Sequence, residues 1–233
     1  RKGINKMIFE STAKSGLKDI GKDNLIKDTT ILEILENVAG EHSDKVGYGV
    51  LNIEQTKASW VLLEWKVKTW GRYFQKASTY RDFEIFNSKG ELCVIATSKW
   101  ALIDINTHSI MRLTDEIKNL YQPEEKGVFE EETLSKIEIP ENYTNKIEYT
   151  IGRKDIDINN HMHNTYYLDL AYETLPKEIY DKRPFNTFRI TYKKEIQLGD
   201  KVICKYANTN QKNTIVISNE EKNIINAIIE LEN

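Results

Sequence analysis

Residues 153–176 (RKDIDINNHMHNTYYLDLAYETLP) contain the densest group of side chains that can do chemistry, including two of the four histidines. Asp157, Asn159 and His161 follow one another at two-residue spacing. If the backbone is extended there, all three side chains leave it on one side, where a carboxylate, an amide and an imidazole can orient a water molecule and a carbonyl group. An asparagine-rich turn that only caps a buried helix explains the same spacing, and the spacing alone favours that plainer interpretation.

The same segment joins a predicted strand to a predicted helix. Alternating apolar residues predict a strand over 146–153, and apolar residues at helical spacing predict a helix over about 162–175. Asn159 or Asn160 is expected to cap this helix and Pro176 to end it. The polar group would then lie at the helix N-terminus, where unpaired backbone N–H groups and the helix dipole can hold an oxyanion. The two apolar stripes are Met162, Tyr166 and Leu170, and Tyr167, Ala171 and Leu175.

The composition is that of a globular protein. Of 233 residues, 39% are hydrophobic and 30% charged, and the formal net charge is −3, so nonspecific nucleic-acid binding is not indicated. No apolar run approaches the roughly 20 residues of a membrane span, and no secretory signal peptide is evident. Cys93 and Cys204 lie far apart, so we expect no disulfide framework and a reduced, cytoplasmic setting. Metal-ligand spacing and a glycine-rich phosphate loop are both absent, so we expect no metal and no cofactor.

Two halves share one order of elements, a helix followed by antiparallel strands, without evident sequence identity. In the first half we predict a helix from Thr29 or Thr30 to about His42–Ser43 and strands over 58–67, 79–86 and 91–105. In the second half the helix over 162–175 precedes strands over 187–195, 201–207, 213–218 and 223–231. A short helix is predicted over 114–121. The prediction is an α+β fold in which each sheet wraps one long helix, with domains 1–110 and 145–233 and a linker 111–144.

A longer pattern resembles the signature of the plant and bacterial acyl-acyl carrier protein (ACP) thioesterases, D-x-D-x-N-x-H-x-N-N followed by a tyrosine and a Glu-x-x-Pro helix end. The residues that carry the match are Asp155, Asp157, Asn159, His161, Asn164, Tyr167, Glu173 and Pro176. Further similarity lies in ASWVL at 58–62, RDFEI at 81–85, WALID at 100–104 and Arg112-Leu113. The resemblance therefore spans roughly residues 30–231.

The resemblance implies a tandem hotdog fold, with the acyl-chain pocket in the first domain, the catalytic residues in the second and no cofactor. It implies hydrolysis of fatty acyl-ACP to free fatty acid and carrier thiol, in bacterial fatty acid biosynthesis. Acyl carrier protein is the implied partner, no nucleic acid or membrane partner is expected, and the chain would be a monomer or a homodimer. Two other functions stay open: an acyl-CoA thioesterase of the same fold, and a non-catalytic acyl-binding module.

Acyl carrier protein is acidic, so we expect a basic docking surface, with candidates Arg72, Lys76, Arg81, Arg153 and Lys154.

The resemblance also assigns roles to residues. His161 can exchange protons near neutral pH, because an unperturbed imidazole has a pKa near 6.5. Glu195 stands where the family has a glutamate proposed to be catalytic. Asp157 would orient the water or the imidazole, and Asn159 would hold the carbonyl or the water. The expected substrate-binding residues are Asn164, Tyr167 and Trp60, for which bracing of the loop or filling of the core is the alternative.

Glu195 presents a geometric difficulty. Alternation along the strand 187–195 turns it away from the face of Phe188, so a bulge at Lys193–Lys194 is needed to redirect it. Otherwise it is a surface residue paired with lysines. Some family members carry a cysteine directly after this glutamate, and here that residue is Ile196, so we expect attack by water and no cysteine nucleophile.

The sequence departs from the family pattern in three places. Val67 runs almost directly into Trp70, where the family has an additional strand. Either the first sheet is shortened or residues are missing from the sequence near 68–69, and we favour the second explanation. His163 replaces a common asparagine and Leu170 a common tryptophan, and both changes are expected to alter the acyl pocket.

Overall fold

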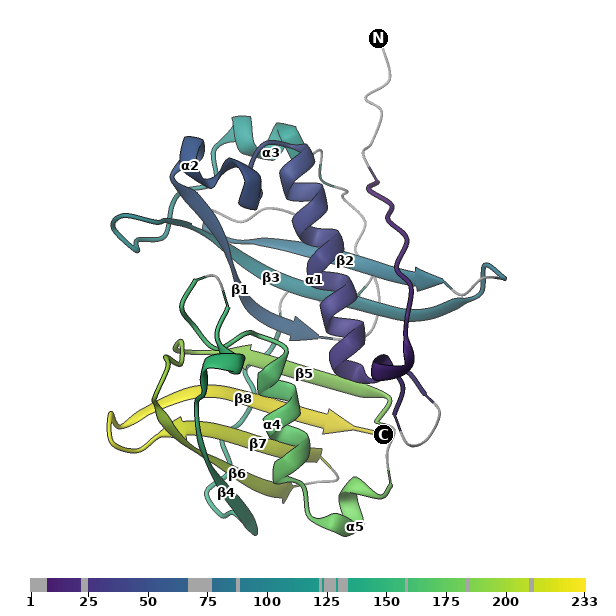
Figure 1. The fold of residues 1–233 in the computed structure, drawn as a ribbon, viewed down its shortest axis with the longest axis vertical. Helices are drawn as coiled ribbons and strands as arrows, with labels where there is room; N and C mark the ends of the chain where they lie inside the picture. Colours follow the sequence, from purple (N-terminus) through teal and green to yellow (C-terminus); the bar gives the residue numbers. More distant parts are fainter. Residues whose placement is uncertain are drawn as a thin grey trace. The chain divides into compact units, whose positions relative to one another are not determined.

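A computed structural model describes residues 8–21, 25–66, 77–86, 89–121, 123, 129, 134–157, 159–182, 185–209 and 212–233. The chain divides into two compact units (Figure 1). The first contains the described residues up to Leu62 and those between Lys68 and Glu132, and the second contains Leu63–Val67 and the residues from Thr133 onward. The segment at 68–69, where we predict missing residues, lies outside the described part of the chain.

The first unit combines one long helix with three strands. Its helices are α1 (Asp28–Lys45), α2 (Ile53–Thr56) and α3 (Asp115–Tyr121), with short 3₁₀ turns η1 (Leu17–Asp19) and η2 (Val50–Asn52). Its strands are β1 (Ala58–Lys66), β2 (Thr79–Phe86) and β3 (Leu92–Asp104), in the order β2-β3-β1. The last residues of β1, Glu64–Lys66, are grouped with the second unit, where they pair with β5 (Thr187–Tyr192).

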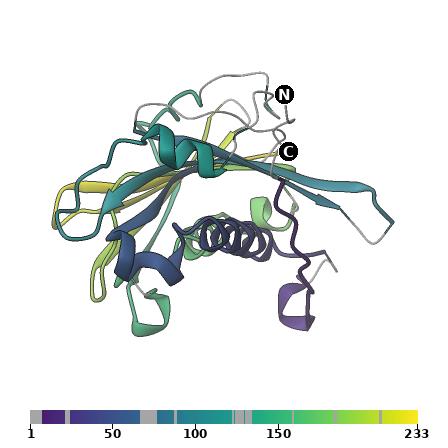
Figure 2. The same cartoon turned by 90° about the horizontal axis from the view of Figure 1, so that it is seen from above.

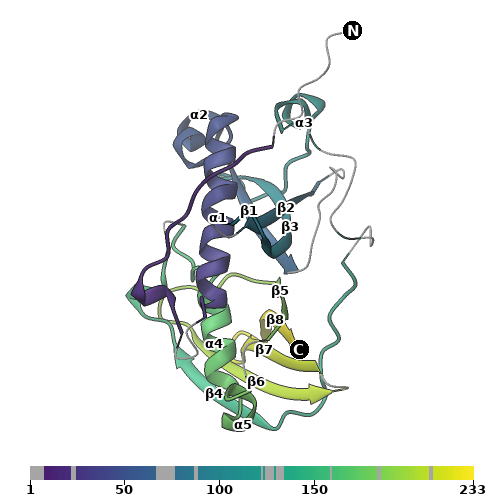
Figure 3. The same ribbon diagram turned by 90° about the vertical axis from the view of Figure 1, so that its right-hand side faces the viewer.

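Helix α1 lies across one face of the sheet of the first unit, as seen along the helix in Figure 2 and from the side in Figure 3. The predicted positions Ile31, Leu35 and Ala39 are buried, and Leu32, which the prediction omitted, is fully buried. The predicted cap was wrong. The helix begins at Asp28, and the preceding Lys27 makes no capping bond through its side chain.

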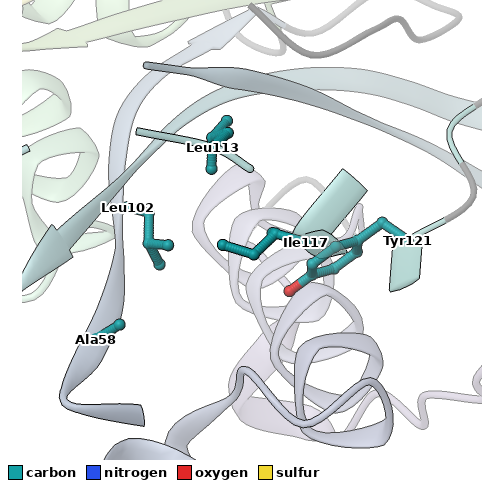
Figure 4. Packing of buried hydrophobic residues seen from close by; sticks show 5 residues of the cluster. All are labelled: Ala58, Leu102, Leu113, Ile117 and Tyr121. Carbon is teal, nitrogen blue, oxygen red and sulfur yellow. The ribbon is translucent and has the colours of Figure 1, made fainter. Parts of the chain in front are cut away.

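Strand β1 is buried on one face over its described part. Ala58 and Leu62 are buried, whereas Val61 between them is exposed, so the expectation of burial on both faces was wrong there. Ala58 joins a hydrophobic cluster with residues of β3, of α3 and of the segment between them (Figure 4). The cluster contains Ala58, Leu102, Leu113, Ile117 and Tyr121. Part of the predicted linker 111–144 therefore packs in the core of the first unit.

The second unit is a five-stranded antiparallel sheet with one helix across it, and the end of β1 extends it at β5 (Figure 1). Its strands are β4 (Asn145–Thr150), β5, β6 (Lys201–Thr209), β7 (Lys212–Asn219) and β8 (Ile224–Glu232), in the order β5-β8-β7-β6-β4. Its helical segments are η3 (Arg153–Asp155), α4 (Tyr166–Thr174) and α5 (Lys177–Tyr180). The predicted α+β organisation is confirmed in both units, while α5 was not predicted.

The sheet of the second unit is covered on both faces. Helix α4 lies on one face and buries Tyr167, Leu168, Leu170 and Ala171. On the other face Ile137 packs with Val216 of β7 and Ile228 of β8, which are paired across the strands. Burial on both faces explains why β7 is buried from its second residue to its end, without the polar–apolar alternation of a half-exposed strand.

A buried polar group lies beside the apolar cluster of the first unit. The Arg81 guanidinium donates hydrogen bonds to the Ala39 carbonyl (3.0 Å) and to Ser43 Oγ (3.2 Å). Tyr121 Oη donates to Ser43 Oγ (3.2 Å) and accepts from Trp60 Nε1 (2.9 Å). Burial, which is the largest cause, and the charges of Arg81 and Lys45 together lower the pKa of His42, which adjoins this group, to about 4.

The pKa of His42 predicts how the first unit responds to acid. The His42 ring is protonated near pH 4 in the folded chain and near pH 6.5 in the unfolded chain. The resulting stabilisation of the fold is complete above pH 6.5 and is lost as the pH falls toward 4. The shift corresponds to about 3 kcal/mol, which we reduce to about 1–2 kcal/mol because the ring is partly exposed.

Urea unfolding between pH 7 and pH 4 should show a shallower loss of stability in His42→Asn than in the wild type. His108→Gln is the control and should keep the wild-type slope, and equal slopes for His42→Asn and the wild type would contradict the expectation.

Candidate active site

The candidate loop folds back on itself and is not extended. Ile156 and Met162 form an antiparallel bridge, and the Asp157 N–H donates to the His161 carbonyl (2.8 Å). Asn160 completes the turn with φ of +61°, a conformation that asparagine tolerates better than most residues. The extended backbone that would put all three side chains on one side is therefore not present, and the segment is the asparagine-rich turn of the alternative interpretation. A tight turn brings these residues together.

The Asp157 carboxylate stabilises the turn from inside. Its Oδ1 accepts hydrogen bonds from the N–H groups of Asn159 (2.8 Å) and His161 (3.3 Å), and its Oδ2 accepts a long one from Asn159 Nδ2 (3.4 Å). Both oxygens of Asp157 thus have donors within the loop. This arrangement suits an orienting role, because the carboxylate holds the Asn159 amide and the His161 backbone in place.

Asp155 anchors the loop to the strand before it. Its buried carboxylate accepts hydrogen bonds from the Gly152 N–H (2.8 Å) and from Tyr149 Oη (3.0 Å). Its carbonyl accepts from the His163 N–H (2.9 Å). Desolvation, and next the hydrogen bond to the Asp155 carboxylate, raise the pKa of Tyr149, so the phenol stays neutral and keeps donating. Asp155 is therefore a structural residue of the loop.

Helix α4 starts later than the sequence predicts. It begins at Tyr166, so neither Asn159 nor Asn160 caps it, and that prediction was wrong. The first backbone donors are already used: the Tyr166 N–H donates to the His163 carbonyl (3.0 Å) and the Leu168 N–H to the Thr165 carbonyl (3.0 Å). The structure therefore gives no support to an oxyanion site built from these two donors.

The segment that carries Glu195 lies directly beside the loop. The Met162 N–H donates to the Ile196 carbonyl (2.8 Å), and His161 and Gln197 form a further backbone bridge. Strand β5 ends at Tyr192, three residues earlier than predicted, and the N–H groups of Lys193 and Lys194 both donate to one carbonyl. Simple strand alternation therefore no longer applies at Glu195.

Tyr167 connects the helix to this segment. It is buried, its ring stands edge-on to Tyr192 at 5.1 Å between centroids, and its phenol has a backbone hydrogen bond at Ile196. Burial raises its pKa, and the carboxylates of Glu195 and Asp157 raise it further. Both carboxylates therefore lie close enough to act electrostatically on one phenol, which places Glu195 in the neighbourhood of the loop.

The predicted site residues thus fall into groups. Two adjacent backbone segments carry the four predicted catalytic residues, Asp157, Asn159, His161 and Glu195. Tyr167 of α4 contacts the second of these segments at Ile196. Within the described residues, neither the His161 ring nor the Glu195 carboxylate has a hydrogen-bond or ion-pair partner. Asn164 lies before the helix and not in its first turn, and its carbonyl accepts a hydrogen bond from Tyr192 Oη (2.9 Å). Trp60 belongs to the first unit, where its indole is bonded to Tyr121.

No cysteine of the chain suits a nucleophilic role. Ile196 occupies the position after Glu195 and is fully buried. Cys204 is also buried, and burial raises the pKa of its thiol to about 12, so it stays protonated at neutral pH. Cys93 is exposed in the first unit. The described residues contain no group of three or more side chains that could hold a metal ion, and none of their helices is long and apolar enough to cross a membrane.

The same loop occurs a second time, 136 positions earlier in the chain. Residues 16–20 (GLKDI) correspond to 152–156 (GRKDI), and each forms a 3₁₀ turn, η1 and η3. Asp19 accepts a hydrogen bond from the Gly16 N–H (2.6 Å) as Asp155 does from Gly152, and the Ile20–Ile26 bridge matches Ile156–Met162. The halves therefore share sequence identity that the sequence analysis missed, and a comparison of the two GxKDI motifs would have revealed it.

Two backbone hydrogen bonds recur in both loops, between residues that the structure describes in each. The Gly21 N–H donates to the Leu25 carbonyl (2.8 Å), as Asp157 does to His161 (2.8 Å). The Lys27 N–H donates to the Asp19 carbonyl (2.9 Å), as His163 does to Asp155 (2.9 Å). At the two ends of the turn the side chains differ, because Gly21 stands at the position of Asp157 and Leu25 at that of His161. This loop therefore folds without a carboxylate or an imidazole at those positions, and their presence in the second unit is not a requirement of the fold.

Comparison with known families identifies both halves. The model described as the acyl-ACP thioesterase N-terminal domain matches residues 6–121, and that of the acyl-ACP thioesterase C-terminal domain matches residues 138–232. The two matches together cover most of the chain and meet in the same region as the boundary between the compact units.

Curated plant proteins match over most of this chain. The chloroplastic oleoyl-acyl carrier protein thioesterase 2 of Arabidopsis thaliana is 27% identical over 213 residues, which are 78% of this chain and 58% of the relative. A chloroplastic dodecanoyl-[acyl-carrier-protein] hydrolase of Umbellularia californica is 21% identical over 219 residues, 83% of this chain and 57% of the relative. The chain thus spans less than three fifths of the length of these two relatives.

Solved structures share the fold over nearly the whole chain. An acyl-ACP thioesterase from Bacteroides thetaiotaomicron superimposes with a TM-score of 0.80 at 20% identity, with 93% of each chain covered. The 12:0-ACP thioesterase of Umbellularia californica gives a TM-score of 0.80 at 16% identity, with 94% of each chain covered. These similarities confirm the predicted tandem hotdog fold.

The repeated loop predicts that alanine substitution lowers the free energy of unfolding much more at one of two neighbouring aspartates than at the other. Asp155→Ala removes a buried acceptor of two hydrogen bonds and should lower the free energy of unfolding by about 1.5–3 kcal/mol. Asp157→Ala should cost less than about 1 kcal/mol, because the first unit forms the same turn around Gly21. Urea unfolding of both variants measures the difference. An Asp157→Ala variant as unstable as Asp155→Ala would show that the carboxylate of Asp157 serves the fold.

Proposed function

The chain belongs to the acyl-ACP thioesterase family, and from this premise we propose that it hydrolyses fatty acyl-ACP thioesters to free fatty acid and carrier thiol. The plant relatives are named as enzymes of this type, and the chain matches less than two thirds of their length. The observation that carries the proposal is the repeated loop. Its second copy has Asp157 and His161 where the first copy has Gly21 and Leu25, on the same hydrogen-bonded frame.

The proposed reaction is direct attack by water. The water oxygen forms a bond to the thioester carbonyl carbon and gives up a proton to a base. The tetrahedral intermediate then collapses, the carbon–sulfur bond breaks, and the base returns the proton to the departing sulfur. Glu195 and His161 are the two proton acceptors for this step, because both are titratable and neither has a hydrogen-bond partner among the described residues. A covalent cysteine intermediate is not part of the proposal, since Ile196 replaces cysteine.

The remaining residues orient the reactants in this proposal. Asp157 holds the turn through the backbone N–H groups of Asn159 and His161 and through the side-chain amide of Asn159. Asn159 is exposed, and its amide holds the carbonyl or the water. Asn164 is bonded through its carbonyl to Tyr192, and Tyr167 contacts the backbone at Ile196. We propose that both residues border the bound substrate. In the first unit, Trp60 is proposed to contact the acyl chain, with residues 1–110 forming the acyl domain and 145–233 the catalytic one.

We also propose acyl carrier protein as the partner, in a cytoplasmic and bacterial setting. Arg153 and Lys154 are exposed on the 3₁₀ turn that leads into the loop, where a basic surface can meet an acidic carrier. Arg81 does not suit this role, because its guanidinium is directed inward to Ala39 and Ser43. The candidates Arg72 and Lys76 lie outside the described residues.

Substitution of the two proton acceptors tests the proposed chemistry. Release of thiol from acyl-ACP of graded chain length should fall by about 100-fold or more in kcat for Glu195→Gln or His161→Ala, because general acid–base catalysis contributes factors of that order. Glu148→Gln, an exposed carboxylate of the same unit, and His108→Ala are the controls and should keep wild-type rates. Unchanged hydrolysis in both site variants would remove the site assignment.

The same assay separates the alternative functions. Equal or faster turnover of acyl-CoA would favour an acyl-CoA thioesterase of this fold. Retention of a fatty acyl ligand without release of thiol from any carrier would favour a non-catalytic acyl-binding module. Faster turnover of acyl-ACP is the expected result.

The repeat supplies a matched test of carrier docking. Lys154→Glu should raise KM for acyl-ACP by about three- to tenfold with little change in kcat, and the effect should shrink as salt is added. Lys18→Glu makes the same change at the equivalent position of the first unit, which is also exposed, and should leave KM unchanged. Equal KM values for the two variants would argue against docking at Arg153 and Lys154.

A further inference from the structure

The chain after β5 is held by a single residue of the neighbouring strand. The N–H groups of Lys193 (2.8 Å) and Lys194 (3.2 Å) both donate to the Asn226 carbonyl. Two successive donors on one acceptor are the mark of a bulged strand. The regular pairing of β5 with β8 ends at Tyr192 and Ala227, immediately before this point.

The side chain of Asn226 holds the same segment a second time. Its Nδ2 donates to the carbonyls of Lys194 and Glu195, both at 3.3 Å. The orientation of the amide is fixed by these contacts, since only the nitrogen can bond to two carbonyl oxygens. Asn226 therefore contacts three successive residues, of which the last is Glu195.

The position of Asn226 is costly for stability. It is fully buried among apolar neighbours of β8, and no described residue donates to its Oδ1. It also lies where β8 departs from regular pairing with β7, because Ile217 pairs with Ala227 and Ser218 pairs with Ile225. A buried amide with an unsatisfied oxygen destabilises a core. Packing alone gives no reason for an asparagine here.

The same segment is fixed on its other side by the loop. The Ile196 carbonyl accepts from the Met162 N–H (2.8 Å), and Gln197 pairs with His161. Residues 193–197 are therefore held between Asn226 and the loop that carries His161. The backbone of Glu195 has little freedom as long as both attachments persist.

We propose that Asn226 is a positioning residue that fixes the backbone of Glu195 and so directs its carboxylate toward the Asp157–His161 loop. The inference rests on the proposed function, since it assigns a reason for the placement of Glu195 in the hydrolytic reaction. Asn226 acts through Glu195 and does not itself contact the substrate. Its unpaired Oδ1 is the stability cost that accompanies this arrangement.

The experiment compares two buried asparagines of one sheet. Asn226→Ala removes both bonds to the Glu195 segment, and Asn226→Ser, with a shorter side chain, is a milder change that serves if the alanine variant folds poorly. We expect a loss of about 10- to 100-fold in kcat for acyl-ACP, because small displacements of a catalytic group cost factors of this order, while KM changes less than threefold. Asn213→Ala is the control: Asn213 is buried in β7 and donates to the Leu231 carbonyl (3.3 Å), so it should lower stability without lowering kcat.

A double-mutant cycle separates positioning from general damage. In the Glu195→Gln background, Asn226→Ala should cause no further loss of kcat, because the group that it positions is already absent. A further tenfold loss of kcat in the Glu195→Gln background would overturn the inference. Wild-type kcat in both Asn226 single variants, with an active wild-type enzyme, would also overturn it, and both results leave the proposed function intact. A wild-type chain that hydrolyses no thioester would overturn the proposed function, and the inference with it.

Discussion

The candidate site depends on one backbone hydrogen bond, from the Met162 N–H to the Ile196 carbonyl, and on the neighbouring bridge between His161 and Gln197. These contacts join a turn that precedes α4 to a segment that follows β5, more than thirty residues later. Without them, Glu195 would belong to a separate surface of the second unit. With them, two titratable side chains from distant parts of the sequence are held on adjacent strands of backbone, which is the geometry that a water-activating site needs.

The framework of the loop and its chemistry are separable. Gly16, Asp19 and Ile20 build in the first unit the same turn that Gly152, Asp155 and Ile156 build in the second. The buried aspartate serves the fold in both copies, because its carboxylate satisfies backbone donors that would otherwise lose their partners. The side chains that differ between the copies project from an unchanged frame. Under the proposed function, the duplicated hotdog keeps one copy of the loop for structure alone and uses the other for catalysis.

Local patterns predicted the secondary structure of this chain well, and long-range contacts explain where they failed. The strand over 79–86 and the short helix near 114–121 follow from periodicity and turn residues, and the structure has them at β2 and α3. The start of α4 was misplaced because asparagine is a good cap and an equally good turn residue, and here Asn160 adopts positive φ in a turn. The end of β5 was misplaced because it is set by Asn226, a residue more than thirty positions away, which no local pattern reveals. The closeness of Asp157 and His161 was predictable from their spacing, whereas the backbone contacts that bring the Glu195 segment beside them were not.

The charges of the site constrain how it can stabilise a transition state. Asp157 and Glu195 both act on the Tyr167 phenol, and its raised pKa keeps that phenol neutral, so it adds no third negative charge. Two carboxylates near a thioester oppose the negative charge that develops on its carbonyl oxygen. Neutral or positively charged side chains can hold that oxygen, and the proposed site offers the Asn159 amide and, once it has accepted a proton, the His161 ring. A base that becomes protonated during the attack by water, as His161 does if it accepts the proton, would supply that positive charge at the step in which the oxyanion forms. If Glu195 accepts the proton instead, one of the two opposing charges disappears at the same step. In the proposed reaction, either route lowers the electrostatic cost of the intermediate.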